Sequence, residues 1–259
     1  MKISNQGLTN KILIDTKNNL FIKESINNNI KFLFKKNQEI FWNISKNDFK
    51  TLRPVAFSLK NDSYWEKYTL EKDIKNLYEV KITKKIIEDV FWEINKLHKI
   101  KTNGKISIFN PKEYLNIFIK EISNDKQYSI INEMVKNINW QKLEDSQKSE
   151  NLVISHNDLN RNNIVLLNSK IMIIDFEFVT INSKYFDIAS FMSESLVELD
   201  DINYWIQLGN YNELEKEYIN AWVYYQNVLW SAWALYCFKI TNKEIFLDIY
   251  NEKIKKLTS

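Results

Sequence analysis

The chain of 259 residues has one cysteine, two prolines, three glycines and two histidines. The lone cysteine, Cys237, cannot form an internal disulfide, so the fold does not depend on an oxidising compartment. No stretch approaches the ~20 consecutive apolar residues of a membrane span, and the first residues lack the apolar core of a signal peptide. We therefore expect a cytoplasmic protein that does not insert into a membrane.

Excess charge of either sign is also missing. The net charge of +3 is the difference between 36 basic and 33 acidic residues that are spread along the chain. A nucleic-acid partner is not expected, because that would need clustered basic charge. Only Arg53 and Arg161 are arginines, and the abundance of lysine, asparagine and isoleucine indicates codon bias from an AT-rich genome. This bias lowers the value of any single lysine or asparagine as a functional signal.

A globular chain is indicated by the 44% of hydrophobic and 14% of aromatic residues. Alternating apolar residues predict two strands over 11–24, and helical spacing follows over 29–44. Short strands flank a polar segment near 152–176, and the remainder is mainly helical. The pattern predicts an α+β protein with a small β-rich N-lobe (1–66) and a larger, mainly α-helical C-lobe (67–259), the outline of a two-lobed kinase. The oligomeric state cannot be predicted from this pattern.

The segments SHNDLNRNNIVL and IIDFEF hold the densest polar pattern. His156, Asp158 and Asn163 form H-x-D-x4-N between two predicted strands, and Asp175 ends the next strand, seventeen residues after Asp158. Phosphoryl transfer needs a carboxylate that accepts the hydroxyl proton, and an asparagine with a second carboxylate to hold Mg²⁺ on the phosphates. The alternative is a plain turn, since Asp and Asn side chains bond the local backbone. The combined spacing favours the kinase interpretation.

These two segments resemble the catalytic loop and metal-binding segment of the choline/ethanolamine kinases, within the aminoglycoside-phosphotransferase-like superfamily. The family signatures are H-N-D-x4-N and I-D-F-E. Protein kinases instead have Arg before the Asp and Gly after the Phe, where this chain has Asn157 and Glu177. The resemblance implies a two-lobed, protein-kinase-like fold and a small-molecule kinase. For His156 it leaves two roles open, bracing the loop or exchanging protons, of which we favour bracing.

The same resemblance assigns the remaining roles in this stretch. Asp158 is expected to be the catalytic base, and Asn163 and Asp175 are expected to be Mg²⁺ ligands. Glu177 is expected to add a further carboxylate to the metal shell. Asn160 stands where the family often has glutamine, and it is a candidate for steering the acceptor hydroxyl.

On the nucleotide side, QGLTNK resembles the phosphate-covering turn of the choline kinases. Gly7 lets the backbone approach the phosphates of ATP, and the side chains of Thr9 and Asn10 can donate to them. Lys23 stands where a kinase keeps its phosphate-binding lysine, and Glu39 on the following helix is its expected ion-pair partner. A solvated Lys23 is the alternative, because the chain has many lysines.

On the acceptor side, YFDIASFMSES resembles a family segment that places Glu194 near the positive head of the acceptor. LWSAWALY resembles the family's W-x-x-W motif, with Trp230 and Trp233 as candidate walls of a cation cage, and Tyr250 falls at a further aromatic position. Aromatic faces attract a quaternary ammonium that has no N–H to donate. The alternative is that these aromatic residues form a helical stripe of ordinary core.

The sequence thus predicts an ATP- and Mg²⁺-dependent kinase that phosphorylates the hydroxyl of choline. Ethanolamine kinase is the main alternative, because a primary ammonium prefers direct bonds to carboxylates. Thiamine or aminoglycoside kinase is a weaker one, since a polycation needs a more acidic pocket. A non-enzymatic alternative is an ATP-binding pseudokinase module, although such a module need not keep every catalytic part.

Overall fold

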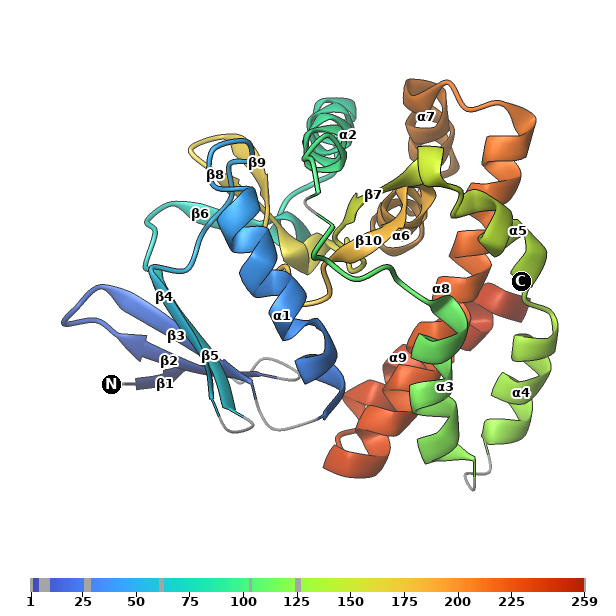
Figure 1. Cartoon of the computed structure of the whole chain (residues 1–259), viewed down its shortest axis with the longest axis horizontal. Coiled ribbons are helices and arrows are strands. Elements are labelled where there is room, and N and C mark those ends of the chain that lie inside the picture. Colours follow the sequence, from blue (N-terminus) through green and yellow to red (C-terminus); the bar gives the residue numbers. More distant parts are fainter. Residues whose placement is uncertain are drawn as a thin grey trace.

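The computed structural model describes residues 2–4, 10–25, 29–60, 63–102, 104–123 and 127–258. It has two lobes, with a strand-rich part on one side and most of the helices on the other (Figure 1). The α+β architecture expected from the sequence is confirmed, with a small sheet in the N-terminal part and a mainly helical C-terminal part.

The N-lobe is built on one antiparallel sheet in the order β1-β2-β3-β5-β4. Its strands are β1 (Lys2–Ser4), β2 (Asn10–Asp15), β3 (Leu20–Ser25), β4 (Ala56–Lys60) and β5 (Ser63–Thr69). Lys23 of β3 pairs in register with Glu66 of β5. Since β5 continues past residue 66 to Thr69, the division between the lobes, which stays a proposal, belongs after this strand.

One helix, α1 (Asn29–Ile44), lies in the described part of the N-lobe. It buries Phe41 and Trp42 against the rest of the protein. At its C-terminal end, the Arg53 guanidinium donates to the carbonyls of Trp42 and Phe49, both at 3.0 Å, and also to that of Ser45. The bond to Trp42 satisfies one of the carbonyls that a helix end leaves without partners.

Two small sheets lie between the N-lobe and the helices (Figure 1). One is antiparallel in the order β6 (Ile74–Asn76), β8 (Ile164–Leu167), β9 (Lys170–Ile173), and the other pairs β7 (Leu152–Ser155) with β10 (Thr180–Ser183). The chain passes from β7 to β8 and from β9 to β10 through two polar loops. The predicted catalytic and metal-binding residues lie on these loops.

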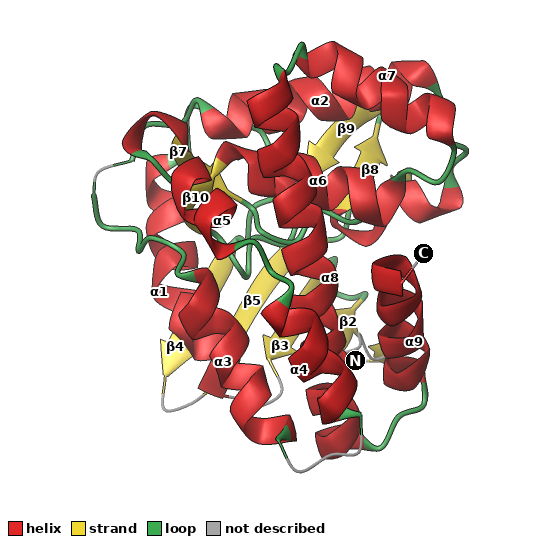
Figure 2. Ribbon diagram, turned by 90° about the vertical axis from the view of Figure 1, so that its right-hand side faces the viewer, coloured by secondary structure: helices red, strands yellow, loops and turns green. Residues whose placement is uncertain are grey.

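The C-lobe is mainly helical (Figure 2). Its helices are α2 (Lys84–His98), α3 (Pro111–Ile122), α4 (Tyr128–Lys136), α5 (Trp140–Ser146), α6 (Lys184–Ser195), α7 (Leu199–Gly209), α8 (Glu213–Thr241) and α9 (Ile245–Thr258), with short 3-10 turns at Leu77–Glu79, Ser149–Asn151 and Arg161–Asn163.

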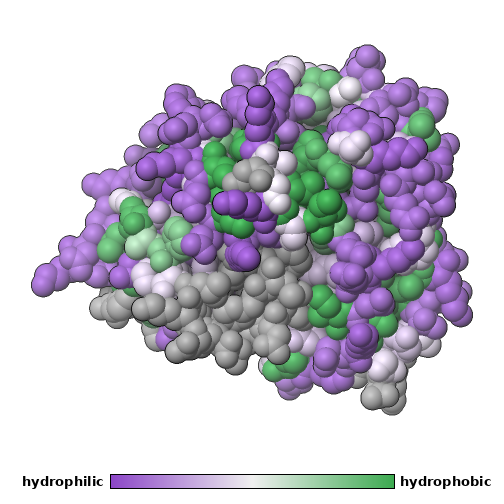
Figure 3. All heavy atoms as spheres, viewed as in Figure 1, coloured by the Kyte–Doolittle hydropathy of each residue, from purple (hydrophilic) through white to green (hydrophobic). Residues whose placement is uncertain are grey.

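The helix α8 is the centre of this lobe, because α3, α4, α5, α6 and α9 all pack against it. A reciprocal capping box between Asn212 and Glu215 begins the helix, and Asn242 ends it with a left-handed backbone at φ 52°. No helix among the described residues has the length and apolar character needed to cross a membrane. Hydrophilic residues cover most of the face in Figure 3, and hydrophobic ones gather near its centre.

Candidate active site

The loop between β7 and β8 is fixed in place by Asp187, which lies in the first turn of α6. The Asp187 carboxylate accepts hydrogen bonds from the backbone N–H groups of His156 and Asn157, each at 2.9 Å, and from His98 Nε2 at 2.9 Å. Burial would raise the pKa of this carboxyl, but the bonds from His98 and the loop hold it below its ordinary value. Asn157 has a left-handed backbone, with φ 64°, which turns the chain toward Asp158.

His156 is held at both ring nitrogens. Its Nε2 donates to the carbonyl of Ile174 at 2.8 Å, and its Nδ1 accepts from the N–H of Asp158 at 3.2 Å. The ring packs edge-on against Phe176, with centroids 4.8 Å apart. Burial lowers the pKa of His156, so the neutral ring is favoured. This geometry supports the bracing role, since neither nitrogen is left to exchange a proton with a substrate.

Asp158 lies at the centre of a set of amides. Its Oδ1 accepts from Asn160 Nδ2 at 2.9 Å, and its Oδ2 accepts from Asn163 Nδ2 at 2.8 Å. Burial, followed by the negative charges of Glu177 and Asp175, raises the pKa of Asp158 well above its ordinary value. A raised pKa suits a general base, which works best when its pKa lies near the working pH. The predicted base, its amide neighbours and the two acidic residues therefore do come together.

The metal-binding segment follows β9. Asp175 has a left-handed backbone, φ 65°, and its carboxylate forms an ion pair with Lys23. The Lys23 ammonium also lies 3.4 Å from Glu177 Oε2. Burial lowers the pKa of Lys23, but the carboxylates of Asp175, Glu177 and Glu66 outweigh it and raise the pKa. The predicted phosphate-binding lysine thus reaches the predicted metal ligands and is not solvated.

The donor set fits Mg²⁺. Asp175 and Glu177 offer carboxylate oxygens, and both hydrogen bonds formed by the Asn163 side chain use its amide nitrogen, which leaves the amide oxygen for a ligand role. Within the described ranges, no three His, Cys, Asp or Glu side chains form a ready metal cage. Mg²⁺ is usually held by only one or two carboxylates together with substrate phosphates, so such a cage is not required.

The prediction for Glu39 is wrong. Its side chain is exposed on the outer face of α1, beside Lys36, Asn43 and Lys105, and it forms no ion pair with Lys23. The preceding residue, Gln38, faces inward instead and donates to Glu66 Oε1 at 2.7 Å.

Glu66 is fully buried, and its negative charge helps to raise the pKa of Lys23. Its Oε1 also accepts from the Tyr64 hydroxyl at 2.8 Å and from Trp42 Nε1 at 3.4 Å. Of the predicted phosphate-covering residues, Gly7 and Thr9 lie outside the described residues, and Asn10 is the buried first residue of β2.

The side chain of Phe176 packs the predicted metal-binding segment against the N-lobe helix α1. The ring is fully buried and stacks on Phe41 at a centroid distance of 4.3 Å. It also meets Trp42 at 5.5 Å and Phe49 at 6.0 Å, both edge-on. Because Asp175 and Glu177 flank this ring, packing under α1 fixes where both carboxylates lie.

The aromatic residues of α8 divide into two groups. Trp222 and Tyr225 are fully buried and belong to the core. Trp230 and Trp233 lie further along the helix, 5.9 Å apart edge-on; Trp230 is also buried, whereas Trp233 is only half-buried. Trp230 meets Phe178 of the metal-binding segment at 6.2 Å. An aromatic series therefore begins next to Glu177 and runs along α8.

The other predicted acceptor residues lie where α6, α8 and α9 meet. Glu194, in the last turn of α6, forms an ion pair with Lys253 of α9. Tyr250 is buried one turn before Lys253 on the same helix. Arg161, on the catalytic loop, donates to the Ser195 carbonyl through Nε at 2.9 Å and also through its second guanidinium nitrogen. This bond connects the catalytic loop to the end of α6.

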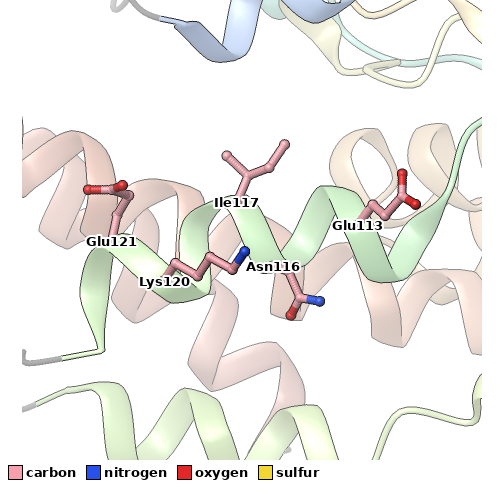
Figure 4. Close-up of a pocket in the computed structure, with 5 residues that line it drawn as sticks. All are labelled: Glu113, Asn116, Ile117, Lys120 and Glu121. Carbon is pink, nitrogen blue, oxygen red and sulfur yellow. The ribbon is translucent and has the colours of Figure 1, made fainter.

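Tyr114 of α3 lies beside the predicted site, and the sequence did not reveal this. Its ring lies 6.5 Å from that of Phe178. Burial raises the pKa of its hydroxyl well above the ordinary value, and the charges of Asp158 and Glu177 add to that effect. The only sequence signal was the apolar helical spacing of α3, which is typical of core. The neighbouring pocket on α3, lined by Glu113, Asn116, Ile117, Lys120 and Glu121, contains none of the predicted site residues (Figure 4).

Comparison with known proteins agrees with this geometry. The family model described as choline/ethanolamine kinase matches residues 60–220. A protein described as a LicA homolog from Metamycoplasma hominis is 26% identical over an alignment of 213 residues, and the match covers 74% of this chain and 72% of that protein.

Solved structures share the fold. Choline kinase LicA from Streptococcus pneumoniae superposes with a TM-score of 0.75 at 13% identity, over 99% of this chain and 92% of the other. A LicA structure in complex with AMP gives a TM-score of 0.77, also at 13% identity, over 99% and 90% of the two chains. An ethanolamine kinase from Plasmodium vivax gives 0.68 at 17% identity, over 99% and 80%.

Proposed function

The chain belongs to the choline/ethanolamine kinase family, whose members are ATP-using phosphotransferases with an alcohol as acceptor. From this premise we propose that the acceptor of this enzyme is choline and that the product is phosphocholine. The observation that carries the choice is the aromatic series from Phe178 to Trp230 and Trp233. A trimethylammonium group has no N–H to donate, and aromatic faces bind it through cation–π attraction.

The roles proposed for the catalytic residues follow from their contacts. The choline hydroxyl oxygen attacks the γ-phosphorus, the bond from that phosphorus to the bridging oxygen of ADP breaks, and Asp158 takes the hydroxyl proton. Asn160 and Asn163, which both donate to the Asp158 carboxylate, keep its orientation fixed during this transfer. Asn160 is proposed to steer the acceptor hydroxyl, because its side chain donates to the Asp158 carboxylate.

Mg²⁺ is proposed to be held by the oxygens of Asn163, Asp175 and Glu177, where it would neutralise charge on the phosphates. Lys23, already beside these carboxylates, is proposed to bind the phosphates of ATP. Gly7, Thr9 and Asn10 are proposed to cover the same phosphates, as the resemblance of their segment to the family turn implies.

A coupled assay of ADP release tests the acceptor. Purified protein with Mg²⁺ and ATP is given choline, ethanolamine, thiamine or kanamycin, and kcat/KM is measured for each. We expect choline to give the highest value and ethanolamine the next. A higher value for ethanolamine would transfer the proposal to that alcohol, and no stimulation by either would refute it.

A further inference from the structure

Glu194, the carboxylate predicted to lie near the positive head of the acceptor, already pairs with a lysine of the protein itself. The ammonium of Lys253 donates to Glu194 Oε2, and the two side chains are only 5% and 16% exposed. The lysine also lies 3.5 Å from Glu252, whose carboxylate is more than half exposed. A lysine buried to this degree is uncommon unless it is paired. Lys253 is therefore a built part of the acceptor region and not a surface charge.

The position of Glu194 is fixed from both sides. Lys256 donates to the Ser193 carbonyl at 2.8 Å, and Arg161 donates to the Ser195 carbonyl. The carboxylate cannot easily move away from Lys253 toward a ligand while its neighbours are held in this way.

Several buried polar atoms at this junction lack a partner within the described part of the chain. They include Glu194 Oε1, Asn227 Oδ1 and the Tyr250 hydroxyl. Buried polar groups are nearly always hydrogen-bonded, so the unpaired ones at this junction point to a bound ligand or water. Glu194 thus keeps one oxygen free, although its charge is already balanced by Lys253.

We propose that Lys253 determines which ammonium the enzyme accepts, by neutralising Glu194; this rests on the proposed function. A primary ammonium is compact and strongly hydrated, so it needs strong hydrogen bonds from an anion to replace its water. A carboxylate whose charge is already balanced by a lysine attracts a ligand ammonium less strongly than a free carboxylate does. A trimethylammonium group depends mainly on aromatic faces, and Trp230 and Trp233 provide them whether or not Glu194 is balanced.

The test is the ratio of kcat/KM for choline to kcat/KM for ethanolamine in Lys253→Met, which keeps an unbranched chain without the charge. We expect this ratio to fall about tenfold, because a hydrogen bond to a free carboxylate is worth at least that factor. The change should lie in the KM for ethanolamine, while kcat for choline changes little. Lys255→Met is the matched control, since Lys255 is an exposed lysine on the same helix.

Two further variants control for a folding defect, because removing the Lys253 ammonium leaves the buried charge of Glu194 without its partner. Lys253→Gln lacks the charge but can still donate to Glu194, and it should shift the ratio in the same direction. Lys253→Arg keeps the charge and should keep the wild-type ratio. A wild-type ratio in both uncharged variants overturns the assignment of Lys253, even when choline is a good substrate. Failure of both alcohols with the wild-type enzyme overturns the proposed function instead.

Discussion

Replacing Phe176 with alanine should both destabilise the protein and weaken its use of Mg²⁺. The ring is fully buried and contacts Phe41, Trp42, Phe49 and His156 at centroid distances of 4.3 to 6.0 Å. Truncation of a buried phenylalanine costs about 3–5 kcal/mol. For a chain of this size each kcal/mol lowers Tm by about 2 °C, so we expect a fall of roughly 6–10 °C.

The functional effect follows from the neighbours of this ring. Asp175 and Glu177 flank Phe176, so a cavity under α1 frees both carboxylates from their fixed positions. The Mg²⁺ concentration for half-maximal activity should therefore rise, when it is measured well below the new Tm. Phe191→Ala is the matched control, because Phe191 is also fully buried but packs on Trp205, at 4.8 Å, away from the carboxylates.

Differential scanning fluorimetry measures the stability of the three proteins, and the ADP-release assay gives their Mg²⁺ dependence. Phe191→Ala should lose comparable stability without a change in Mg²⁺ dependence. The reasoning is refuted if Phe176→Ala keeps the wild-type Mg²⁺ dependence, or if its Tm falls by no more than a degree or two.

Three further predictions concern single groups of the site. Asp158→Ala should lower kcat by about 10²–10⁴-fold, the usual contribution of a general base, while ATP binding measured by calorimetry is retained; unchanged turnover contradicts the assignment. Glu66→Gln should lower the free energy of unfolding in urea by about 1–3 kcal/mol, because the buried carboxylate accepts from Gln38 and Tyr64, whereas Glu39→Gln on the exposed face should change it by less than about 0.5 kcal/mol. Burial lowers the pKa of His156 in the folded protein, so the unfolded chain binds a proton first as the pH falls. The contribution of His156 to stability is therefore complete above about pH 6.5 and is lost as the pH falls below that value. The free energy of unfolding should decrease by up to about 1.4 kcal/mol per pH unit. His156→Gln should flatten this slope in urea titrations at pH 5 to 7, and a wild-type slope in the variant would count against the buried neutral ring.

The parts of the site that are local in sequence could be predicted from it. Asp158 and Asn163 are fixed by one short loop, and Asp175 follows the next hairpin, so their spacing alone determines that they converge. The strands on either side have enough β-branched and aliphatic residues to be recognised. Loop chemistry and strand propensity therefore agreed for this region, and the structure brings the three side chains together.

The parts that depend on distant partners could not be predicted. The apolar residues of α1 allow more than one face, and the true face is decided by Gln38, which is buried because Glu66 accepts its hydrogen bond. A buried glutamine looks like a surface residue in a sequence, so the prediction turned Glu39 inward, whereas Lys23 pairs with Asp175 and Glu177. Lys253 was hidden in the same way, because its partner Glu194 is 59 residues away.

The two arginines of this chain stabilise the fold, because their guanidinium groups donate to backbone carbonyls near the ends of helices α1 and α6. The ion pairs of the candidate site are formed by lysines. Lys23 pairs with Asp175 and Glu177, and Lys253 pairs with Glu194. The charge of Glu194 is thus balanced by a lysine of the protein itself. A cationic acceptor that approaches Glu194 therefore meets little net charge there. Salt then has little electrostatic attraction to screen. Acceptor binding by this enzyme should accordingly vary only slightly with ionic strength, unlike binding to an open acidic pocket.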